Sequence, residues 1–393
     1  MSAHASPGLS RRIAAVQAPI IPVVGAWTRN MPGTLSFGQG MVSYPPPESA
    51  LAAIRDFGRQ PEHHLYGSAF GHPDLLAAIE HKLRLENGID VAAGVDVMVS
   101  AGSNMGFLNV LLAITDPGDE IILPLPYYFN QEMAVRMLNC MPVAVPTDTS
   151  YQLDLSLLRA AITEKTRAIV TISPNNPSGA VYPEAALRAV NALCRDFGLY
   201  HISDEAYEYF TYGAARHFSP GSLPGAEAHT ISLFSLSKAY GFASWRIGYL
   251  VFPKVLTPAL LKIQDTNLIC PPLISQIAAT GALAAGSAYC KSQLPALAAK
   301  REQVLARLQP LHGLCQITEP EGAFYLLLRI NTSKNDLDLA KTLVEDFKVA
   351  AIPGSAFGFS AGCYLRISYG MLDAVQLEAA LDRLINGILR FVG

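Results

Sequence analysis

Charged side chains are scarce in this sequence, and its basic residues are scattered. Of the 393 residues, 16% are Asp, Glu, Lys or Arg, and the formal net charge is −3. A protein that neutralises nucleic-acid phosphates carries its Lys and Arg as a stripe or patch, which this sequence lacks. The composition therefore argues against a nucleic-acid partner and favours a small-molecule ligand.

Cysteine is scarce as well, with six residues far apart in the sequence. Neither the paired spacing of a zinc site nor a C-x-x-C redox motif occurs. The sequence therefore predicts no metal site, and it predicts reduced thiols in a cytoplasmic protein. The six residues are Cys140, Cys194, Cys270, Cys290, Cys315 and Cys363.

No uninterrupted apolar run is long enough to span a bilayer, so we expect no membrane contact. One segment, residues 13–27, follows Arg11 and Arg12 and has the general form of a twin-arginine export signal. However, Pro19 and Pro22 interrupt it and no small-residue cleavage site follows. We therefore expect the protein to stay in the cytoplasm.

Hydrophobic residues, by contrast, make up half of the sequence, which is enough for a large buried core. Through the middle of the chain β and α patterns alternate, which predicts a parallel sheet with helices between its strands. Apolar and β-branched runs predict strands at residues 97–100, 120–123, 168–173, 199–203, 230–234 and 247–252. Helical spacing and turn residues predict helices at residues 103–113 and 183–198.

After about residue 285 the pattern changes to a long predicted helix at 287–308, a strand at 323–330 and an amphipathic helix at 374–391. We therefore predict an α/β fold in which residues 46–285 form a large domain with a mostly parallel central sheet flanked by helices. Residues 1–45 and 286–393, the two chain ends, are predicted to form a smaller α+β domain.

Polar residues gather where the predicted strands end, which is where open α/β sheets bind ligands. One such cluster is Ser235-Leu236-Ser237-Lys238, with Arg246 eight residues later. Small and apolar neighbours would lower the pKa of the Lys238 amine and make it nucleophilic toward an aldehyde. A surface lysine would be the ordinary interpretation, but Ser235, Ser237 and Arg246 beside it could together hold a phosphate.

Asp204 and Arg366 are charged residues in apolar surroundings. Asp204 follows the apolar run 199–202, and a buried carboxylate needs a cationic partner such as a protonated pyridine nitrogen. It could equally be a helix N-cap. Arg366 lies in the strand-like segment 364–368 and must find a carboxylate or phosphate, from the protein or from a substrate.

Two loops add further polar groups. The prolines and glycine of residues 173–179 predict a rigid loop that points asparagines into a cleft, although turn formation alone could explain them. Gly102-Ser103-Asn104 at a helix start offers backbone N–H groups to an anion, although Ser103 or Asn104 could simply cap the helix.

Three of these segments together carry a resemblance to a known family. They are Ser-Pro-Asn-Asn-Pro-Ser-Gly at 173–179, Ser-Asp-Glu-Ala-Tyr at 203–207, and Ser-Leu-Ser-Lys-Ala-Tyr-Gly-Phe-Ala-Ser-Trp-Arg-Ile-Gly-Tyr at 235–249. In this order and spacing the sequence resembles the class I and II aminotransferases among the fold type I pyridoxal-phosphate (PLP) enzymes. The resemblance covers nearly the whole chain from about Gly33 onward.

The resemblance implies that Lys238 forms a Schiff base with PLP and shuttles a proton during catalysis. It implies that Asp204 pairs with the pyridine nitrogen and that Tyr207 bonds the 3-oxygen of the cofactor. These three are the predicted catalytic residues. The residues that the resemblance assigns to cofactor binding are Gly102, Ser103, Asn104, Tyr128, Asn176, Asp204, Tyr207, Ser235, Ser237, Lys238, Arg246 and Tyr66.

For the substrate, the resemblance implies that Arg366 grips the α-carboxylate, assisted by Asn176 and by the backbone at Gly40. It also implies a homodimer with shared active sites, in which Tyr66 reaches the cofactor phosphate of the neighbouring subunit. Tyr66 could alternatively be an aromatic turn residue.

The implied reaction moves an amino group between an L-amino acid and a 2-oxo acid. Aspartate-specific relatives often carry a lysine where this chain has Asn104, so neutral, aromatic or sulfur-containing amino acids are favoured over aspartate. Arg11, Arg12 or Arg29 could still supply a second cation.

A PLP-dependent C–S lyase is the main alternative on this scaffold. A non-catalytic PLP-binding regulator is less favoured, since no helix-turn-helix extension precedes the domain.

Overall fold

A seven-stranded sheet forms the centre of the larger part of the molecule, as shown by a computed structural model that describes residues 8–392. Its strands are β2 (Val95–Ser100), β3 (Glu120–Pro124), β4 (Met141–Val145), β5 (Thr166–Ile172), β6 (Tyr200–Asp204), β7 (Thr230–Ser235) and β8 (Gly248–Pro253). Their order is β2-β8-β7-β6-β5-β3-β4. All neighbours are parallel except that β8 runs antiparallel to both β2 and β7. The predicted α/β class with a mostly parallel sheet is confirmed.

The direction of β8 is a feature that the sequence pattern did not indicate. Between β7 and β8 the chain forms only the short helix α9 (Leu236–Ala239) and one helical turn, η6 (Ala243–Trp245). A parallel neighbour requires a crossover that carries the chain back along the sheet, usually an α-helix, and this connection contains no helix long enough to do so. The polar residues between β7 and β8 therefore stay at the carboxyl end of β7.

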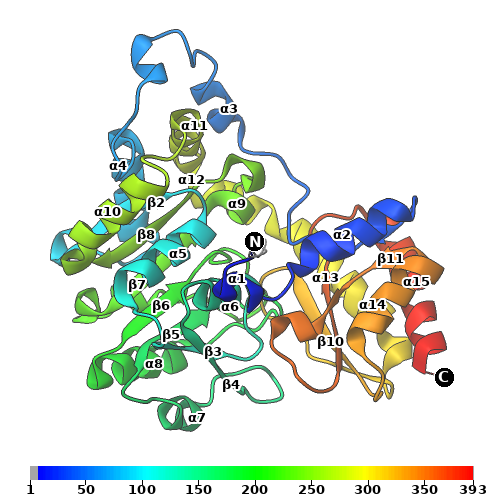
Figure 1. Ribbon diagram of the computed structural model, residues 1–393. Helices are drawn as coiled ribbons and strands as arrows, with labels where there is room; N and C mark the ends of the chain where they lie inside the picture. Colours follow the sequence, from blue (N-terminus) through cyan, green and yellow to red (C-terminus); the bar gives the residue numbers. More distant parts are fainter. Residues whose placement is uncertain (1–7, 393) are drawn as a thin grey trace, which may run out of the picture.

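Helices cover both faces of this sheet (Figure 1). Successive side chains of β3 point to opposite faces of the sheet, so the strand contributes to a hydrophobic core on each face. Ile121 and Leu123 pack with α5 and α6, whereas Ile122 packs with α7 and α8. The helices of this part are α3 (Glu48–Ala53), α4 (Pro73–Lys82), α5 (Ser103–Ile114), α6 (Phe129–Met137), α7 (Leu155–Ala160), α8 (Glu184–Phe197), α10 (Thr257–Asn267) and α11 (Leu273–Ala284).

A second, antiparallel sheet lies in the C-terminal part, with the order β12-β13-β10-β9. The long helix predicted at residues 287–308 is wrong in one respect, because it is two helices that break before Pro295, a residue that favours a helix start. The strands and helices of this part are β9 (Cys315–Ile317), β10 (Tyr325–Ile330), β12 (Ile352–Pro353), β13 (Cys363–Ser368), α12 (Gly286–Ser292), α13 (Leu294–Arg307), α14 (Asp336–Phe347) and α15 (Ala374–Val392).

The N-terminal segment packs on this C-terminal part. Strand β1 (Leu35–Ser36) pairs in parallel with β11 (Val349–Ala350), and α2 (Ile20–Asn30) buries Ile20 and Val24 in a cluster with Val344. A further short helix, α1 (Arg11–Ala14), precedes α2. The division after residues 45 and 285 stays a prediction, and residues 1–7 and 393 of the smaller predicted domain lie outside the described residues.

Single helical turns complete the structure. They are η1 (Pro61–His64), η2 (Leu83–Asn87), η3 (Val91–Ala93), η4 (Pro220–Ser222), η5 (Ala226–Ala228), η7 (Lys254–Leu256), η8 (Gln309–Leu311) and η9 (Gly354–Phe357).

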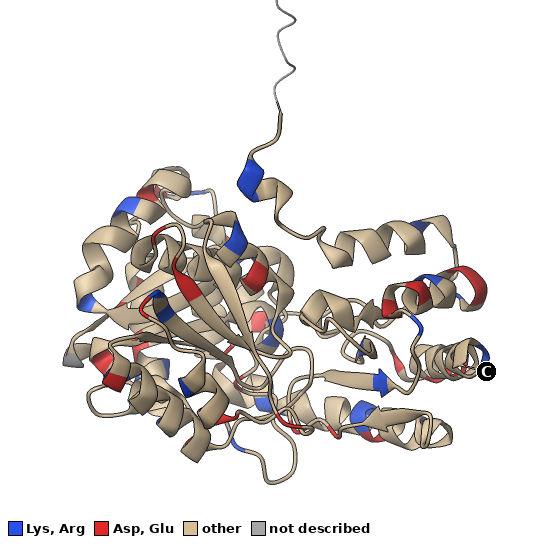
Figure 2. Cartoon of the chain, turned by 60° about the horizontal axis from the view of Figure 1, so that its bottom comes forward, with Lys and Arg blue, Asp and Glu red and all other residues tan. Residues whose placement is uncertain are grey.

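Most of the cartoon in Figure 2 is uncharged, with Lys and Arg mixed among Asp and Glu on both parts of the molecule. Among the described residues, no single helix is long and apolar enough to cross a bilayer. One pair, Leu273–Ala284 and Gly286–Arg307, passes that test by length and composition only when joined, and the pair is bent by 82°.

Candidate active site

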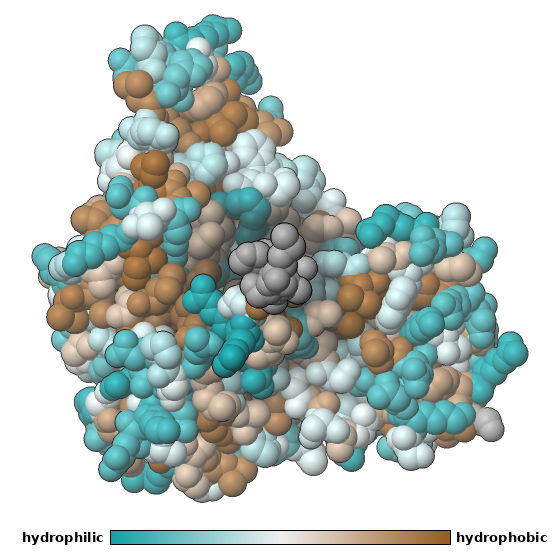
Figure 3. Space-filling model, in the orientation of Figure 1, coloured by the Kyte–Doolittle hydropathy of each residue, from teal (hydrophilic) through white to brown (hydrophobic). Residues whose placement is uncertain are grey.

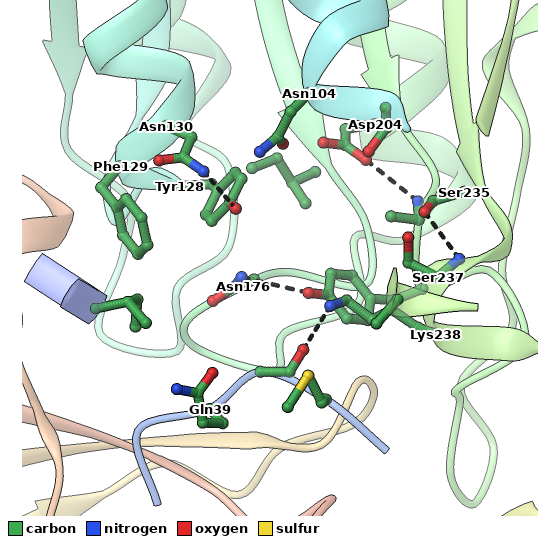
Figure 4. Close-up of a pocket in the computed structure, with 18 of the residues that line it drawn as sticks. Gln39, Asn104, Tyr128, Phe129, Asn130, Asn176, Asp204, Ser235, Ser237 and Lys238 are labelled. Atoms are coloured by element: carbon green, nitrogen blue, oxygen red, sulfur yellow. Dashed lines mark hydrogen bonds between the residues drawn. The ribbon is translucent and has the colours of Figure 1, made fainter. Parts of the chain in front are cut away.

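A cavity of about 460 Å³ opens where β5, β6 and β7 end and where the two parts of the molecule meet. Figure 4 shows side chains from several elements converging on it. Twelve residues predicted for the site line this cavity: Gly40, Ser103, Asn104, Tyr128, Asn176, Asp204, Tyr207, Ser235, Ser237, Lys238, Arg246 and Arg366.

Lys238 lies in α9, whose start is fixed by the side chain of Ser235, which accepts a hydrogen bond from the amide of Ser237 at 3.1 Å. The Lys238 ammonium donates to the carbonyl oxygen of Gly40, and it forms no ion pair within residues 8–392. Burial, reinforced by the positive charges of Arg366 and Arg246, lowers the pKa of this amine to about 8. A large neutral fraction is therefore present near pH 8, as an attack on an aldehyde requires.

Asp204 is the last residue of β6 and is buried. Its carboxylate accepts hydrogen bonds from Gln131 Nε2 at 2.8 Å and from the amide of Ala206 at 3.2 Å. Burial raises its pKa to about 6, although these hydrogen bonds lower it. No regular helix begins here, so Asp204 does not cap a helix but presents a buried carboxylate to the cavity. Within the described chain it has no cationic partner.

The start of α5 and Arg246 form a positively charged corner of the cavity. Gly102 is the N-cap of α5, at φ 80°, and no side chain caps the first amides of the helix. Ser103 and Asn104 are therefore not caps. The positive φ favours glycine at this position, and a Cβ here would lie 2.5 Å from Arg246 Nη2 and displace the guanidinium. Gly102 does not itself line the cavity.

Arg246 has hydrogen-bonding capacity left for an anion. It donates to the carbonyl oxygens of Ala243 at 2.9 Å and of Ala101 at 3.5 Å, and within the described residues it has no carboxylate partner. Together with the hydroxyls of Ser103 and Ser235 on the same wall, this corner suits a phosphate.

Arg366, in the middle of β13, is only 2% exposed. It donates to the Gly38 carbonyl oxygen at 2.7 Å and to Asn176 Oδ1 at 3.0 Å, while its Nε has no partner. Burial lowers its pKa, and within residues 8–392 no carboxylate pairs with it. A buried guanidinium that faces a cavity with only neutral acceptors is suited to a carboxylate ligand.

The two asparagines of the loop at residues 173–179 have different roles: one stabilises the turn and the other faces the cavity. Asn175 Oδ1 accepts hydrogen bonds from the amide and hydroxyl of Ser178, at 3.0 and 2.8 Å, which is the expected turn role. Asn176 instead faces the cavity, where its Nδ2 donates to the Tyr207 hydroxyl at 3.3 Å. Turn formation thus explains only the first asparagine.

Two predicted residues are aromatic and lie differently. Tyr128 lines the cavity, and its hydroxyl accepts a hydrogen bond from Asn130 at 2.8 Å (Figure 4). Tyr66 is 81% exposed and does not contribute to the cavity of its own chain. Its predicted role in a neighbouring subunit stays a prediction.

The sequence analysis missed several residues that line the cavity. Tyr325 lies within the predicted strand 323–330, where one aromatic residue in an apolar run carries no distinguishing pattern. Pro19, Ile21 and Pro22 belong to the segment first considered as an export signal. The other missed residues are Gln39, Met41, Phe129, Asn130, Ile172, Ala206 and Ala243.

The donor set of the cavity fits PLP. A buried amine of lowered pKa can bond the aldehyde, and the unpaired carboxylate of Asp204 can bond a protonated pyridine nitrogen. The corner formed by Ser103, Ser235 and Arg246 can accept the phosphate. Residues 8–392 contain no group of three or more His, Cys, Asp or Glu side chains placed to hold a metal ion.

Comparison with known proteins agrees with this geometry. Residues 32–384 match the family described as aminotransferase class I and II. The chain belongs to this family. It is therefore a class I/II aminotransferase, and members of the family generally use PLP. This assignment supports transamination over the elimination reaction that the sequence left open.

Two relatives in sequence differ in the substrate that their names state. The chain is 34% identical to an aromatic aminotransferase, ISS1, of Arabidopsis thaliana over 390 residues, which is 97% of this chain and 96% of that protein. It is also 34% identical to an aspartate aminotransferase of Rhizobium meliloti over 363 residues, 88% of this chain and 87% of that protein.

The solved structures that resemble this chain also include both aspartate and aromatic aminotransferases. An aspartate aminotransferase from Thermus thermophilus with maleate superposes with a TM-score of 0.89 at 31% identity, covering 97% of this chain and all of that one. An aromatic aminotransferase from Pyrococcus horikoshii superposes with a TM-score of 0.84 at 30% identity, covering 94% and 99%. The fold therefore does not decide the substrate.

Proposed function

We propose that this aminotransferase binds PLP covalently through Lys238 and transfers an amino group between an L-amino acid and a 2-oxo acid. The observation that carries the proposal is the charge arrangement of the cavity. It brings a buried carboxylate without a cation, Asp204, together with two guanidinium groups without anions, Arg246 and Arg366. A cofactor with a cationic ring and a phosphate, joined to a substrate carboxylate, satisfies all three.

Each residue then has a definable task. When bound, PLP supplies an electron sink for the bond that breaks at the substrate α-carbon. Arg366 holds the α-carboxylate at the far side of the cavity, which orients the substrate relative to Lys238. Lys238 Nζ takes the proton from the α-carbon and later returns one. Tyr207 and Asn176 hold the cofactor oxygen beside the amine.

The substrate side chain has an uncharged environment. Asn104 lines the cavity near Tyr128, and Ile21, Met41 and Phe129 add apolar side chains to its lining. None of Arg11, Arg12 and Arg29 lines the cavity. Among residues 8–392, its cationic side chains are Lys238, Arg246 and Arg366 alone. We infer that neutral, aromatic or sulfur-containing amino acids are preferred to aspartate, because the lining offers no additional cation for a side-chain carboxylate.

This preference is testable by mixing the PLP-loaded protein with single amino acids and following the visible absorbance. Phenylalanine, tyrosine and methionine are expected to react at least about tenfold more efficiently than aspartate, since one missing ion pair is worth at least about 1.4 kcal/mol. Asn104→Lys should raise the efficiency with aspartate, and Asn104→Gln is the matched neutral control. A wild-type preference for aspartate would contradict the inference.

We also infer that the active enzyme is a homodimer. The segment between α3 and α4 projects from the larger part as a limb (Figure 1). Leu65 and Tyr66 in this segment are exposed, as is Leu51 of α3. In Figure 3 the tip of this limb is mostly hydrophilic, and apolar side chains lie below it. A second subunit would cover this surface and bring its Tyr66 toward the phosphate corner.

The six free thiols support the proposed cytoplasmic location.

Asp204→Asn should affect the cofactor-free and PLP-bound proteins in opposite ways. The pKa of Asp204 is about 6 in the fold, above its ordinary 3.8, so stability without cofactor falls as the pH rises through this interval. The variant should therefore stabilise the cofactor-free protein at pH 8, by on the order of 1–3 kcal/mol, and change little at pH 4. With PLP bound the wild type should be the more stable, because its carboxylate pairs with the ring nitrogen.

Thermal unfolding of both forms at the two pH values measures this reversal. Asp265→Asn, at an exposed position of α10, is the control and should change neither form. Equal destabilisation of both forms by Asp204→Asn would show that the carboxylate does not serve a cofactor.

A further inference from the structure

A buried pair of tyrosines lies at the base of the cavity. The hydroxyl of Tyr325, the first residue of β10, is 2.7 Å from that of Tyr207. Both rings are buried, and they meet edge to face with centroids 5.5 Å apart. Tyr207 also accepts a hydrogen bond from Asn176 Nδ2. The Tyr325 hydroxyl is therefore a direct neighbour of the group proposed to bond the cofactor oxygen.

The ring of the same tyrosine supports the substrate side of the cavity. The Arg366 guanidinium lies 4.8 Å from the centroid of Tyr325, within the range of a cation–π contact. Arg366 in turn donates to Asn176 Oδ1. Tyr325, Tyr207, Asn176 and Arg366 thus form a closed circuit, which we call the tyrosine circuit. It joins the proposed carboxylate site to the proposed partner of the cofactor.

The backbone is shaped around this hydroxyl. A Cβ at residue 40 would lie 2.5 Å from the Tyr325 oxygen, so only glycine leaves room for it. The carbonyl of that same Gly40 accepts the hydrogen bond of Lys238. A Cβ at Gly179 would meet the backbone of Tyr325 instead, 2.8 Å from its carbonyl oxygen. Glycines on two separate segments therefore allow the close approach.

The number of protons and lone pairs on the two hydroxyls determines which way the hydrogen bonds of the circuit run. A tyrosine hydroxyl has one proton to donate and two lone pairs to accept with. Tyr207 already accepts from Asn176. If Tyr325 donates to it as well, both lone pairs are occupied, and the single proton of Tyr207 is left to point into the cavity. The nearby charge of Arg366 does not compete for the Tyr325 proton, because a guanidinium cannot accept a hydrogen bond.

We propose that Tyr325 is a positioning residue of the aminotransferase: its hydroxyl directs the proton of Tyr207 toward the cofactor oxygen, and its ring seats Arg366 for the substrate carboxylate. The inference rests on the proposed function, since it takes PLP and an amino acid as the ligands of the cavity. Tyr325 itself acts only through its two neighbours.

Two substitutions separate the roles of the hydroxyl and the ring. Tyr325→Phe removes the hydroxyl and keeps the ring, so PLP should still be trapped on Lys238 by borohydride. The pH at which the visible absorbance of bound PLP changes should rise by about half to one unit, the equivalent of one hydrogen bond. The Kd of an unreactive carboxylate that the wild type binds, 3-phenylpropanoate or maleate, should change less than about twofold.

Tyr325→Leu removes the ring as well. It should shift the absorbance titration equally and also raise the Kd of the same carboxylate by about five- to thirtyfold, as expected for a desolvated cation–π contact. The matched control is Tyr364→Phe on β13, which removes a hydroxyl outside the cavity and should leave both measurements at their wild-type values.

An unshifted absorbance titration in Tyr325→Phe would overturn the proposal, and this near-isosteric variant is informative even if Tyr325→Leu does not fold. An equal shift in Tyr364→Phe would also overturn it, because the effect would then be general. Failure of the proposed function itself would look different, since the wild-type protein would take up no PLP and give no titration to compare.

Discussion

Lys238→Ala is expected to abolish both turnover and covalent attachment of PLP. The structure provides no substitute amine, because Lys238 is the one lysine among the described residues that line the cavity. Loss of a positioned proton-transfer group alone lowers rates by about 10²–10⁴-fold, and loss of the covalent link adds to this. Borohydride reduction followed by mass analysis of the intact chain measures attachment, and stopped-flow mixing with amino acid measures the rate.

A control lysine is available on the surface. Lys262→Ala, at an exposed position of α10, removes an ordinary amine and should leave attachment and turnover unchanged. Normal turnover by Lys238→Ala would refute the assignment of the nucleophile. Attachment without turnover would show that another lysine can bond PLP but cannot move the substrate proton.

Arg366→Ala is expected to weaken binding of both the amino acid and the 2-oxo acid while PLP stays bound. Removing one partner of a buried charge pair costs about 2–5 kcal/mol, so kcat/KM should fall by roughly 30- to several-thousand-fold. Arg366→Lys should recover only part of this, because an ammonium cannot form the two parallel hydrogen bonds of a guanidinium. The measurement is kcat/KM for each substrate beside the PLP content of the purified protein.

The neighbouring strand supplies the comparison for this variant. Arg329 lies on β10 opposite β13 and is exposed, so Arg329→Ala should leave substrate affinity unaltered. If Arg366→Ala lost PLP while retaining substrate affinity, the guanidinium would belong to the cofactor, and the orientation proposed for the cavity would be reversed.

The residues that could be predicted from the sequence are those whose chemistry conflicts with their surroundings. Lys238, Asp204 and Arg366 are charged residues within or beside apolar runs, and such residues need partners wherever they lie. The convergence of Lys238 and Asp204 followed from the alternation of strands and helices, since parallel strands bring their carboxyl ends to one edge. Arg366 comes from the second, antiparallel sheet, so this argument did not place it. The family resemblance then assigned roles that the residues alone left open.

Other features depend on contacts that local sequence does not encode. Tyr325 is one of several aromatic residues in apolar strands, and only its distance from Tyr207 distinguishes it. Strand β8 runs antiparallel to β2 and β7, and its apolar residues would suit a parallel or an antiparallel strand equally well. Ile21 joined the cavity because α2 packs against residues more than 300 positions later, a contact that no periodicity indicates.

The pairing of β1 with β11 has a consequence for how the protein is made. The segment after β1 provides the carbonyl of Gly38 to Arg366, 328 residues later, and that of Gly40 to Lys238. A ribosome synthesises Gly38 long before Arg366, because 328 positions separate them in the sequence. An unfinished chain therefore has its reactive lysine but no completed clamp for a substrate. The proposed carboxylate site is complete only once these two distant segments have met.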